Sequence, residues 1–342
     1  MWSPLLDYTH DRILACNIYI YNVRMTTPSR IIGMGETVMD ILFRETSDSS
    51  GRPTGEFSPF AAVPGGSSFN SMISVGRSGV PSLFIGYTGS NRVGRQIATF
   101  LQENGISTDF FEMRECENAS LSLAYLNSQG DADYTFYKET PRASASFSIP
   151  HFTYRDYLLF GSYFAVCQGL RPQVSSTLKA ARQADAVIYY DINIRRSHQH
   201  ELPLLWDNIK ENARLSSIVR GSADDFVIIY GTSHPEEIYE KYISPLCPIF
   251  ICTSGAGRIS ICTPSRVLDF SVPPIPRDEI VSTVGAGDSF NAGFLCEMHN
   301  QGISHADLSA LSEQVWQSLV ARGVQYASQV CRSQDNYIKK SM

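Results

Sequence analysis

From residue 30 onwards, short runs of β-branched and aromatic residues alternate with longer segments that have the apolar spacing of helices. The runs expected as strands are Ile31 to Gly35, Ser82 to Gly86, Tyr157 to Phe160, Ala186 to Asp191, Phe226 to Tyr230, Ile249 to Thr253 and Ile259 to Thr263. The segments expected as helices are Ser67 to Gly79, Gly94 to Gly105, Arg171 to Ala184, Leu202 to Ala213, Gly287 to His299 and Ala306 to Cys331, the last interrupted near Ala310. This alternation is typical of a parallel sheet covered by helices, so it predicts an α/β fold.

Two segments, 41–63 and 120–138, interrupt the alternation. Each contains strand-like residues separated by turn-forming residues such as Gly, Pro or Ser. We expect these segments to form a small antiparallel sheet beside the main body.

The chain of 342 residues is 43% hydrophobic and only 18% charged, whereas soluble domains average about 25% charged residues. It therefore has ample apolar material for a large core, in either one large α/β domain or two smaller ones. The net charge of −6 argues against affinity that comes from neutralising nucleic-acid phosphates. No apolar run approaches the roughly 18 to 20 residues that span a bilayer, which argues against a transmembrane protein.

The eight cysteines are widely spaced and form no C-x-x-C pair. Zinc ribbons and thioredoxin-like centres need that close spacing, and disulfide scaffolds are shorter and denser in cysteine. Most of the cysteines lie in apolar stretches, where cysteine acts as a small buried hydrophobe. The pattern indicates reduced thiols in a cytoplasmic protein.

Residues 1–24 have neither the basic start nor the continuous apolar segment of a secretory signal. The first strand-like run begins at Arg30, shortly after Met25. We expect residues 1–24 to be an extension outside the core, residues 25–342 to form the folded domain, and removal of the extension to leave stability nearly unchanged.

Two common nucleotide-binding patterns are absent. Gly33-Met34-Gly35 follows a strand, but Val38 occupies the third glycine position of the dinucleotide fingerprint, and its bulk opposes the close packing that the fingerprint needs. The chain contains no Gly-Lys pair, so it lacks the lysine of a Walker A loop.

The most informative segment is Gly285-Ala286-Gly287-Asp288, which opens an apolar helix. Because the first N–H groups of a helix lack partners and carry partial positive charge, the small residues here predict an anion site. Asp288 has two interpretations. It caps the helix, or, where the anion is a phosphoryl group, it takes the proton of an incoming hydroxyl.

A second glycine cluster, Gly65-Gly66, precedes Asn70 at the start of another expected helix. Bare backbone permits close approach of a polar ligand, and the Asn70 amide offers a donor and an acceptor. A tight turn is the alternative. Asp40 follows the first strand and is placed either to accept hydrogen bonds from sugar hydroxyls or to cap a turn.

These motifs belong to a set that occurs in a fixed order along the chain. In order they are Gly35-Glu36 with Asp40, Gly65-Gly66 with Asn70, Gly86 with Gly89-Ser90-Asn91-Arg92-Val93-Gly94, Asp191-Ile192-Asn193-Ile194-Arg195, and Gly285-Ala286-Gly287-Asp288. The set resembles the ribokinase-like, PfkB-type family of carbohydrate kinases over about residues 30–335. Its Asp-x-Asn-x-Arg element is similar to that of the fructokinase and 2-keto-3-deoxygluconate kinase branch.

The resemblance implies a three-layer α/β/α domain with a mostly parallel central sheet and a small β-sheet lid, here segments 41–63 and 120–138. It also implies transfer of the ATP γ-phosphoryl group to a hydroxyl of a small sugar or sugar acid, with Mg²⁺. Asp288 would be the general base and the amides of Gly285, Ala286 and Gly287 the anion hole. The sugar would be held by Asp40, Gly65, Gly66, Asn70, Lys138 and Arg195. For Arg195 a salt bridge is the alternative to contact with an acidic substrate, and Lys138 would otherwise be solvated.

Several positions depart from the family pattern. Ser282 replaces an Asp that helps to hold a monovalent cation, which puts potassium activation in doubt. The family's Asn-x-x-Glu element, which organises magnesium and phosphate, appears here as Ser222-Ala223-Asp224-Asp225. Asp225 keeps a carboxylate with a shorter reach, so it is expected to hold Mg²⁺ through water. The nucleotide loop contains Thr253, Gly255 and Gly257, with its second glycine one place early.

Two other functions remain open. A nucleoside kinase on the same fold would need an aromatic pocket, for which Phe43, Phe57, Phe60 and Phe136 are candidates. A sugar-binding sensor with weakened catalysis is suggested by Ser282 and Ser222, whereas the anion-hole glycines and Asp288 argue against it.

We also expect a homodimer that pairs through the lid. Apolar residues alternate at Ile41 to Phe43 and at Leu121 to Tyr125. An exposed strand edge of this kind invites pairing with another chain.

Overall fold

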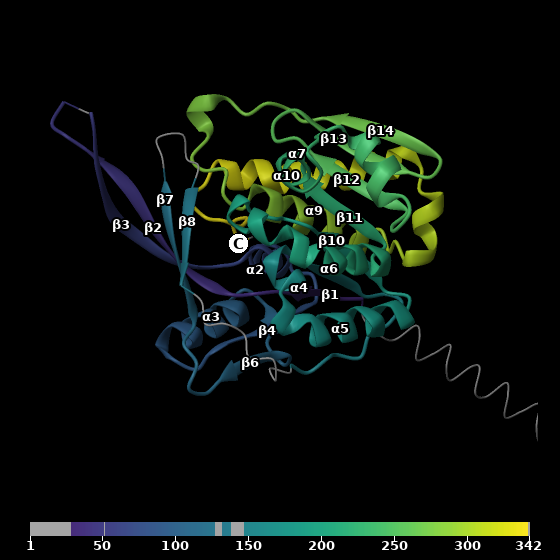
Figure 1. The fold of residues 1–342 in the computed structure, drawn as a ribbon, viewed down its shortest axis with the longest axis horizontal. Helices are drawn as coiled ribbons and strands as arrows, with labels where there is room; N and C mark the ends of the chain where they lie inside the picture. The colour runs from purple at the N-terminus through teal and green to yellow at the C-terminus, as the bar shows by residue number, and fades with distance from the viewer. Residues whose placement is uncertain (1–28, 51, 127–131, 138–146, 341–342) are drawn as a thin grey trace, which may run out of the picture.

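The computed structural model describes residues 29–50, 52–126, 132–137 and 147–340. Its ten-stranded main sheet has the order β14-β13-β12-β11-β10-β9-β1-β4-β5, with β6 paired to β4 (Figure 1). The strands are β1 Ile31–Met34, β4 Ser82–Gly89, β5 Ile106–Ser107, β6 Phe111–Arg114, β9 Tyr157–Gly161, β10 Val187–Asp191, β11 Ile218–Ser222, β12 Ile249–Thr253, β13 Arg258–Thr263 and β14 Arg266–Ser271. All strand pairs are parallel except β12 with β13 and β13 with β14, which confirms the predicted mostly parallel sheet.

Helices cover both faces of this sheet, because its parallel strands bury side chains on both sides. The helices are α2 Ser67–Arg77, α3 Arg92–Glu103, α4 Ser162–Val166, α5 Arg171–Gln183, α6 Leu202–Leu215, α7 Ala223–Tyr230, α8 Pro235–Ile238, α9 Ala286–Asn300 and α10 Glu313–Cys331. One core cluster joins Ile31 to α2, α3, α9 and α10, and the other joins Ile32 to α5, α6, α7 and α8. The predicted three-layer α/β/α architecture is confirmed.

The expected strand at Phe226 to Tyr230 is wrong. These residues belong to α7, and the strand at this place is β11. Ser222 ends β11 and caps α7, because Ser222 and Asp225 exchange hydrogen bonds in a capping box. The periodicity of a short apolar run does not distinguish a strand from a buried helix. Here the capping box of Ser222 and Asp225 starts a helix.

The long helix expected at Ala306 to Cys331 is interrupted as predicted. A 3₁₀ helix at His305–Ala310 precedes α10. A serine caps the start of each helix: Ser304 forms a capping box with Asp307, and the Ser312 side chain accepts a hydrogen bond from the N–H of Val315.

The lid is a four-stranded sheet with the order β3-β2-β7-β8, and it stands out from the main body (Figure 1). Its strands are β2 Val38–Ser47, β3 Pro53–Gly65, β7 Ser120–Leu126 and β8 Ala132–Tyr137. Each hairpin is antiparallel, but β2 pairs with β7 in parallel. The expected antiparallel sheet is therefore wrong at its centre, because the chain returns to the main sheet between β3 and β7 and re-enters the lid in the same direction as β2.

Two expectations fall outside this description. The extension 1–24 and Lys138 lie outside the described residues. Among the residues that are described, no helix is long and apolar enough to cross a membrane.

Candidate active site

A cavity of about 370 Å³ lies where several parallel strands end and the lid begins. Ligands in open α/β sheets bind at this edge, outside the carboxyl ends of the strands. The lining residues come from the lid, from the start of α2, from the segments after β9, β10 and β11, and from the start of α9. Among them are the predicted site residues Asp40, Gly66, Asn70, Arg195, Ser222, Asp225, Gly285, Gly287 and Asp288.

Asp288 lies on the first turn of α9 and is held from across the cavity by α2. Ser67 Oγ donates a hydrogen bond to its Oδ1 at 2.8 Å, and Asn70 Nδ2 donates one to its Oδ2 at 3.0 Å. Burial of the carboxyl group raises the pKa of Asp288 to about 6, although these two hydrogen bonds favour the ionised form. At neutral pH Asp288 is therefore an ionised and fixed proton acceptor.

The turn before α9 and the first residues of that helix line the cavity. Gly285 has φ 79° and packs so closely on the Asn336 carbonyl that a Cβ would overlap it, so only glycine fits. Ala286 differs from its glycine neighbours, since its N–H donates to the Thr283 carbonyl at 3.2 Å. Within the described chain, the N–H groups of Gly285 and Gly287 have no such partner.

Asp40 on β2 is buried beside the second glycine cluster. Ser122 of β7 donates a hydrogen bond to its Oδ1, and a Cβ on Gly65 would overlap its Oδ2. Gly65 does not line the cavity itself; it makes room for the carboxyl group that does. Burial raises the pKa of Asp40 to about 6, partly offset by the Ser122 hydrogen bond and the charge of Arg195.

Asn70 joins the two carboxyl groups in one site. Its Nδ2 donates to Asp288, and its buried Oδ1 has no hydrogen-bond partner in the described chain. A buried amide oxygen without a partner is costly unless a ligand supplies a donor. The Asn70 side chain is therefore prepared to accept a hydrogen bond from a hydroxyl group.

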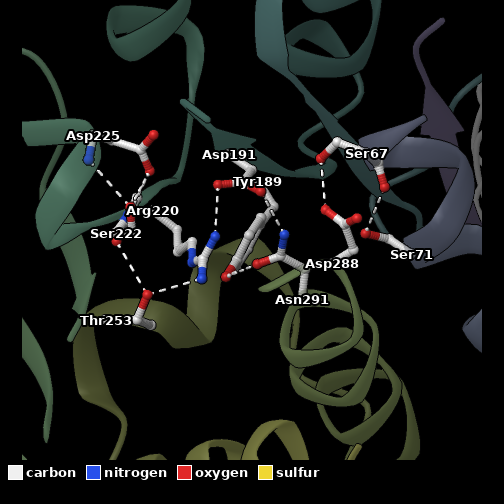
Figure 2. A network of polar contacts seen from close by, with 11 residues as sticks. Ser67, Ser71, Tyr189, Asp191, Arg220, Ser222, Asp225, Thr253, Asp288 and Asn291 are labelled. Atoms are coloured by element: carbon white, nitrogen blue, oxygen red, sulfur yellow. Dashed lines mark hydrogen bonds and ion pairs between the residues drawn. The ribbon is translucent and has the colours of Figure 1, made fainter. Parts of the chain in front are cut away.

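A buried polar network supports the floor of the cavity, and sequence reasoning missed its centre, Arg220 (Figure 2). Arg220 Nη1 donates to Asp191 Oδ1 at 3.0 Å and Nη2 donates to Thr253 Oγ1 at 2.8 Å. Asn291 Nδ2 donates to Asp191 Oδ2 at 2.7 Å, which ties α9 to β10. The attraction of Asp191 holds the pKa of Arg220 above its usual value, although burial acts to lower it. In this network Thr253 accepts a hydrogen bond from Arg220 and so helps to position the guanidinium group.

Arg220 also lies against the start of α9. A Cβ on Gly287 would come within 3.2 Å of Arg220 Nη2. The guanidinium charge and the α9 N–H groups therefore act on the same region of the cavity. An arginine inside an apolar run was the available signal, but the strand that carries it was not recognised.

Asp225 is the candidate metal ligand. Its Oδ2 accepts hydrogen bonds from the N–H and Oγ of Ser222, each at 2.7 Å, and burial raises its pKa. The capping bonds occupy one carboxylate oxygen and leave Oδ1. In the part of the chain that is described, no group of three or more metal-ligating residues occurs.

The remaining predicted nucleotide residues lie apart from this cavity. Gly255 and Gly257 are exposed in the turn between β12 and β13. A second cavity, of about 670 Å³, opens nearby between β14 and α10, and its walls include Phe270, Val320 and Val324. The two features are adjacent, because Val272 N–H donates to the Gly257 carbonyl at 3.2 Å.

Sequence reasoning also missed part of the cavity wall, formed by Tyr163 and His198. Tyr163 follows β9 and His198 lies in a 3₁₀ helix, Arg196–Glu201, that follows β10. No local pattern marks either residue, because the fold alone brings them together.

Two kinases are among the known proteins to which this chain is similar. Aminoimidazole riboside kinase from Salmonella typhimurium is 29% identical over 243 residues, which cover 69% of this chain and 74% of that protein. Fructokinase from Escherichia coli is 25% identical over 277 residues, covering 79% and 85%.

Solved structures show the same fold. A double mutant of fructokinase from Vibrio cholerae O395, crystallised with fructose, ADP and a potassium ion, matches with a TM-score of 0.74 at 19% identity, over 90% of this chain and 94% of that chain. The sequence pattern described as pfkB family carbohydrate kinase matches residues 29–339, which contain every motif of the cavity. This chain thus belongs to the pfkB family of carbohydrate kinases and is a kinase.

Proposed function

We propose that this kinase transfers the γ-phosphoryl group of ATP to a hydroxyl group of a small sugar or sugar acid. One observation carries the proposal: Asp288, an ionised carboxylate held by Ser67 and Asn70, lies at the N-terminus of α9 in the same cavity as Asp40. The cavity thus combines a proton acceptor with an anion site.

In the proposed reaction Asp288 accepts the proton of the attacking hydroxyl. The hydroxyl oxygen then forms a bond to the γ-phosphorus while the bond to the β-phosphate oxygen of ATP breaks, so ADP leaves. A base with a pKa near 6 is suited to this task, because it is ionised at neutral pH and still accepts a proton in the transition state.

The acceptor sugar would be held by the groups opposite Asp288. The Asp40 carboxylate accepts hydrogen bonds from hydroxyl groups, and the unpartnered Asn70 Oδ1 accepts one more. Gly66 and Arg195 complete this part of the lining. For Arg195 we propose contact with the substrate, and for Lys138, which lies outside the described residues, an approach from the lid.

The transferring phosphoryl group would lie against α9. Phosphoryl transfer depends mainly on positioning and on stabilising charge. The N–H groups of Gly285 and Gly287 serve as the anion hole, with Arg220 as a further positive charge beside Gly287. Ala286 contributes its small side chain rather than its N–H, which is bonded to Thr283.

The second cavity would take the nucleoside part of ATP. Its apolar residues, Phe270, Val320 and Val324, suit the adenine ring of ATP, and the cavity adjoins the loop of Gly255 and Gly257. The triphosphate would then run from this loop past Thr253 to α9.

The residues present fit Mg²⁺ in a limited way. Mg²⁺ is usually held by one or two carboxylates together with substrate phosphates and water. Asp225 Oδ1 would provide such a carboxylate, through water, and the bound ion would neutralise charge on the ATP phosphates. A monovalent cation is not part of the proposal, because Ser282 brings no carboxylate and the Cys331 carbonyl already accepts the N–H groups of Val281 at 2.8 Å and Ser282 at 3.3 Å.

The test is ADP release from ATP and Mg²⁺ with a panel of sugars, sugar acids and nucleosides. We expect release with at least one sugar or sugar acid, and its loss in the Asp288→Asn variant. No release with any compound, together with measurable sugar binding by calorimetry, would instead identify a sensor with the same fold.

A nucleoside kinase is the second candidate. The relative from Salmonella typhimurium is named for a riboside, and Val38, Phe136 and Tyr163 give the cavity an apolar side toward the lid. ADP release with ribosides but not with free sugars would favour this function.

We also propose that two chains pair through their lids. The expected strand edge at Ile41 to Phe43 and Leu121 to Tyr125 is wrong, because these runs lie in the inner strands β2 and β7. The edges are β3 and β8, and Phe57, Phe60 and Tyr137 of the lid are 40%, 41% and 59% exposed. Light scattering at increasing protein concentration should give the mass of a dimer, and the mass should fall to that of one chain in a Phe57→Glu, Phe60→Glu double variant.

A further inference from the structure

Three side chains that sequence motifs do not mark are joined at the edge of the cavity. We call Tyr163, His198 and Glu201 the His198 cluster. The rings of Tyr163 and His198 are stacked, with centroids 4.0 Å apart and planes at 21°. Glu201 binds both, because Tyr163 OH donates to its Oε2 at 2.7 Å and His198 Nδ1 lies 2.9 Å from its Oε1.

The contacts determine which atom of His198 is left for a ligand. Although partial burial acts to raise the pKa of Glu201, its hydrogen bonds from His198 and Tyr163 hold that pKa below its usual range. Glu201 is thus an acceptor only, so His198 Nδ1 carries the hydrogen. In the neutral ring Nε2 is then an acceptor, and within the described chain it has no hydrogen-bond partner.

The cluster faces the cavity in a strained part of the backbone. Tyr163 and His198 both line the cavity, as do Ser162 and Asn193. Ser162 and Asn193 have φ values of 56° and 37°, which are uncommon for residues other than glycine. Such strain is concentrated at binding and catalytic sites, where surrounding structure maintains it.

We propose that His198 is a specificity-determining residue: its Nε2 accepts a hydrogen bond from a sugar hydroxyl other than the one that Asp288 deprotonates. Tyr163 and Glu201 are positioning residues, which fix the plane and tautomer of the ring. The inference deepens the proposed function and rests on it, since it requires a sugar in the cavity.

The chain provides a matched control in the same helix. His200 lies two residues from His198, and its Nε2 is 4.0 Å from the same Glu201 Oε1, yet its side chain is 78% exposed, against 20% for His198. His200 does not line the cavity. Replacing it removes a histidine from the surface without changing the site.

The experiment uses the panel sugar with the highest kcat/KM and each of its monodeoxy derivatives. In the His198→Ala variant we expect the KM for the sugar to rise about 3- to 10-fold, with kcat and the KM for ATP within about twofold of wild type. His198→Gln should recover part of the affinity, because its amide oxygen can replace Nε2. Tyr163→Phe should give a smaller rise, and His200→Ala no change.

The deoxy derivatives identify the partner hydroxyl. For one derivative, wild type should lose about 3- to 10-fold in kcat/KM, whereas His198→Ala should lose less than about twofold, since the interaction is already absent. Equal losses in the two proteins for every derivative would overturn the inference while leaving the kinase function intact. No ADP release by wild type with any compound would overturn the proposed function and this inference together. Thermal melting of each variant establishes that the chain has folded.

Discussion

Replacing Asp288 by asparagine should separate its proposed catalytic role from its effect on stability. In the folded protein burial raises the pKa of Asp288 from 3.8 to about 6. At about 1.4 kcal/mol per pKa unit, the ionised carboxylate costs about 3 kcal/mol of folding free energy above pH 6. The uncharged amide does not carry this cost. Its hydrogen bonds can also be kept, because Asn70 can turn its unpartnered Oδ1 toward the new N–H group.

We therefore expect Asp288→Asn to be far less active but more stable at pH 7.5. Loss of the general base should lower kcat by about 10²- to 10⁴-fold, and a gain of about 3 kcal/mol should raise Tm by roughly 4 °C in a domain of this size. The gain depends on pH. As pH falls below about 6, Asp288 in the folded wild type takes up a proton, and its cost declines until the unfolded chain is protonated as well, below about 3.8, so the difference in Tm should be about half as large at pH 5 as at pH 7.5.

The assays are ADP release at saturating substrates and calorimetric melting at pH 5 and pH 7.5. Asp207→Asn is the control, because the Asp207 side chain on α6 is 94% exposed and does not line the cavity, so kcat should not change, and the loss of its exposed ion pair with Lys210 should have little effect on Tm. A kcat within tenfold of wild type would refute the role of Asp288 as base. A lower Tm at pH 7.5 would refute the assigned cost of burying its charge.

Four further outcomes follow from the site. Gly65→Ala should fold but raise the KM for sugar about tenfold or more, because its Cβ displaces the Asp40 carboxyl group; an unchanged KM would contradict the role of Asp40. Ala321→Trp, at an exposed position in the wall of the second cavity, should raise the KM for ATP alone, and a rise for sugar instead would place the nucleotide elsewhere. The value of kcat/KM should increase as pH rises through about 6, where Asp40 and Asp288 ionise; a decrease over pH 5 to 7 would contradict the base mechanism. Turnover should be the same in potassium and choline salts, since Ser282 offers no carboxylate to a cation, and clear activation by potassium would refute this.

Features that depend on neighbouring residues could be predicted from the sequence. The glycines around Ala286 open α9 through local backbone preferences, so a candidate anion site could be proposed without the fold. The same holds for the glycine cluster before Asn70. Parallel strands then bring these motifs to one edge of the sheet, which is why separate motifs converge on one cavity.

Features that depend on long-range packing could not be predicted. Arg220 is buried only because β11 lies between β10 and β12, and the residues of β11 were not recognised as a strand. The Ala286 N–H donates a hydrogen bond to the Thr283 carbonyl and so is not available to an anion, and this depends on the detailed path of a turn. The contact of Tyr163 with His198 joins two segments that follow different strands, and no spacing in the chain encodes it.

Among the described residues, several buried charges lie around this one cavity. Asp191 and Arg220 are only 3% and 7% exposed, and desolvating such a pair commonly costs as much as their attraction returns. Asp40 and Asp288 oppose folding when ionised, and the charge of Asp288 raises the pKa of Asp40 further. Apolar side chains of similar volume at these positions would fill the same space and make the fold more stable. The proposed function explains the placement of these charges, because in it they act on a hydroxyl group and a phosphoryl group, and the two apolar clusters on either side of the sheet supply the stability that offsets them.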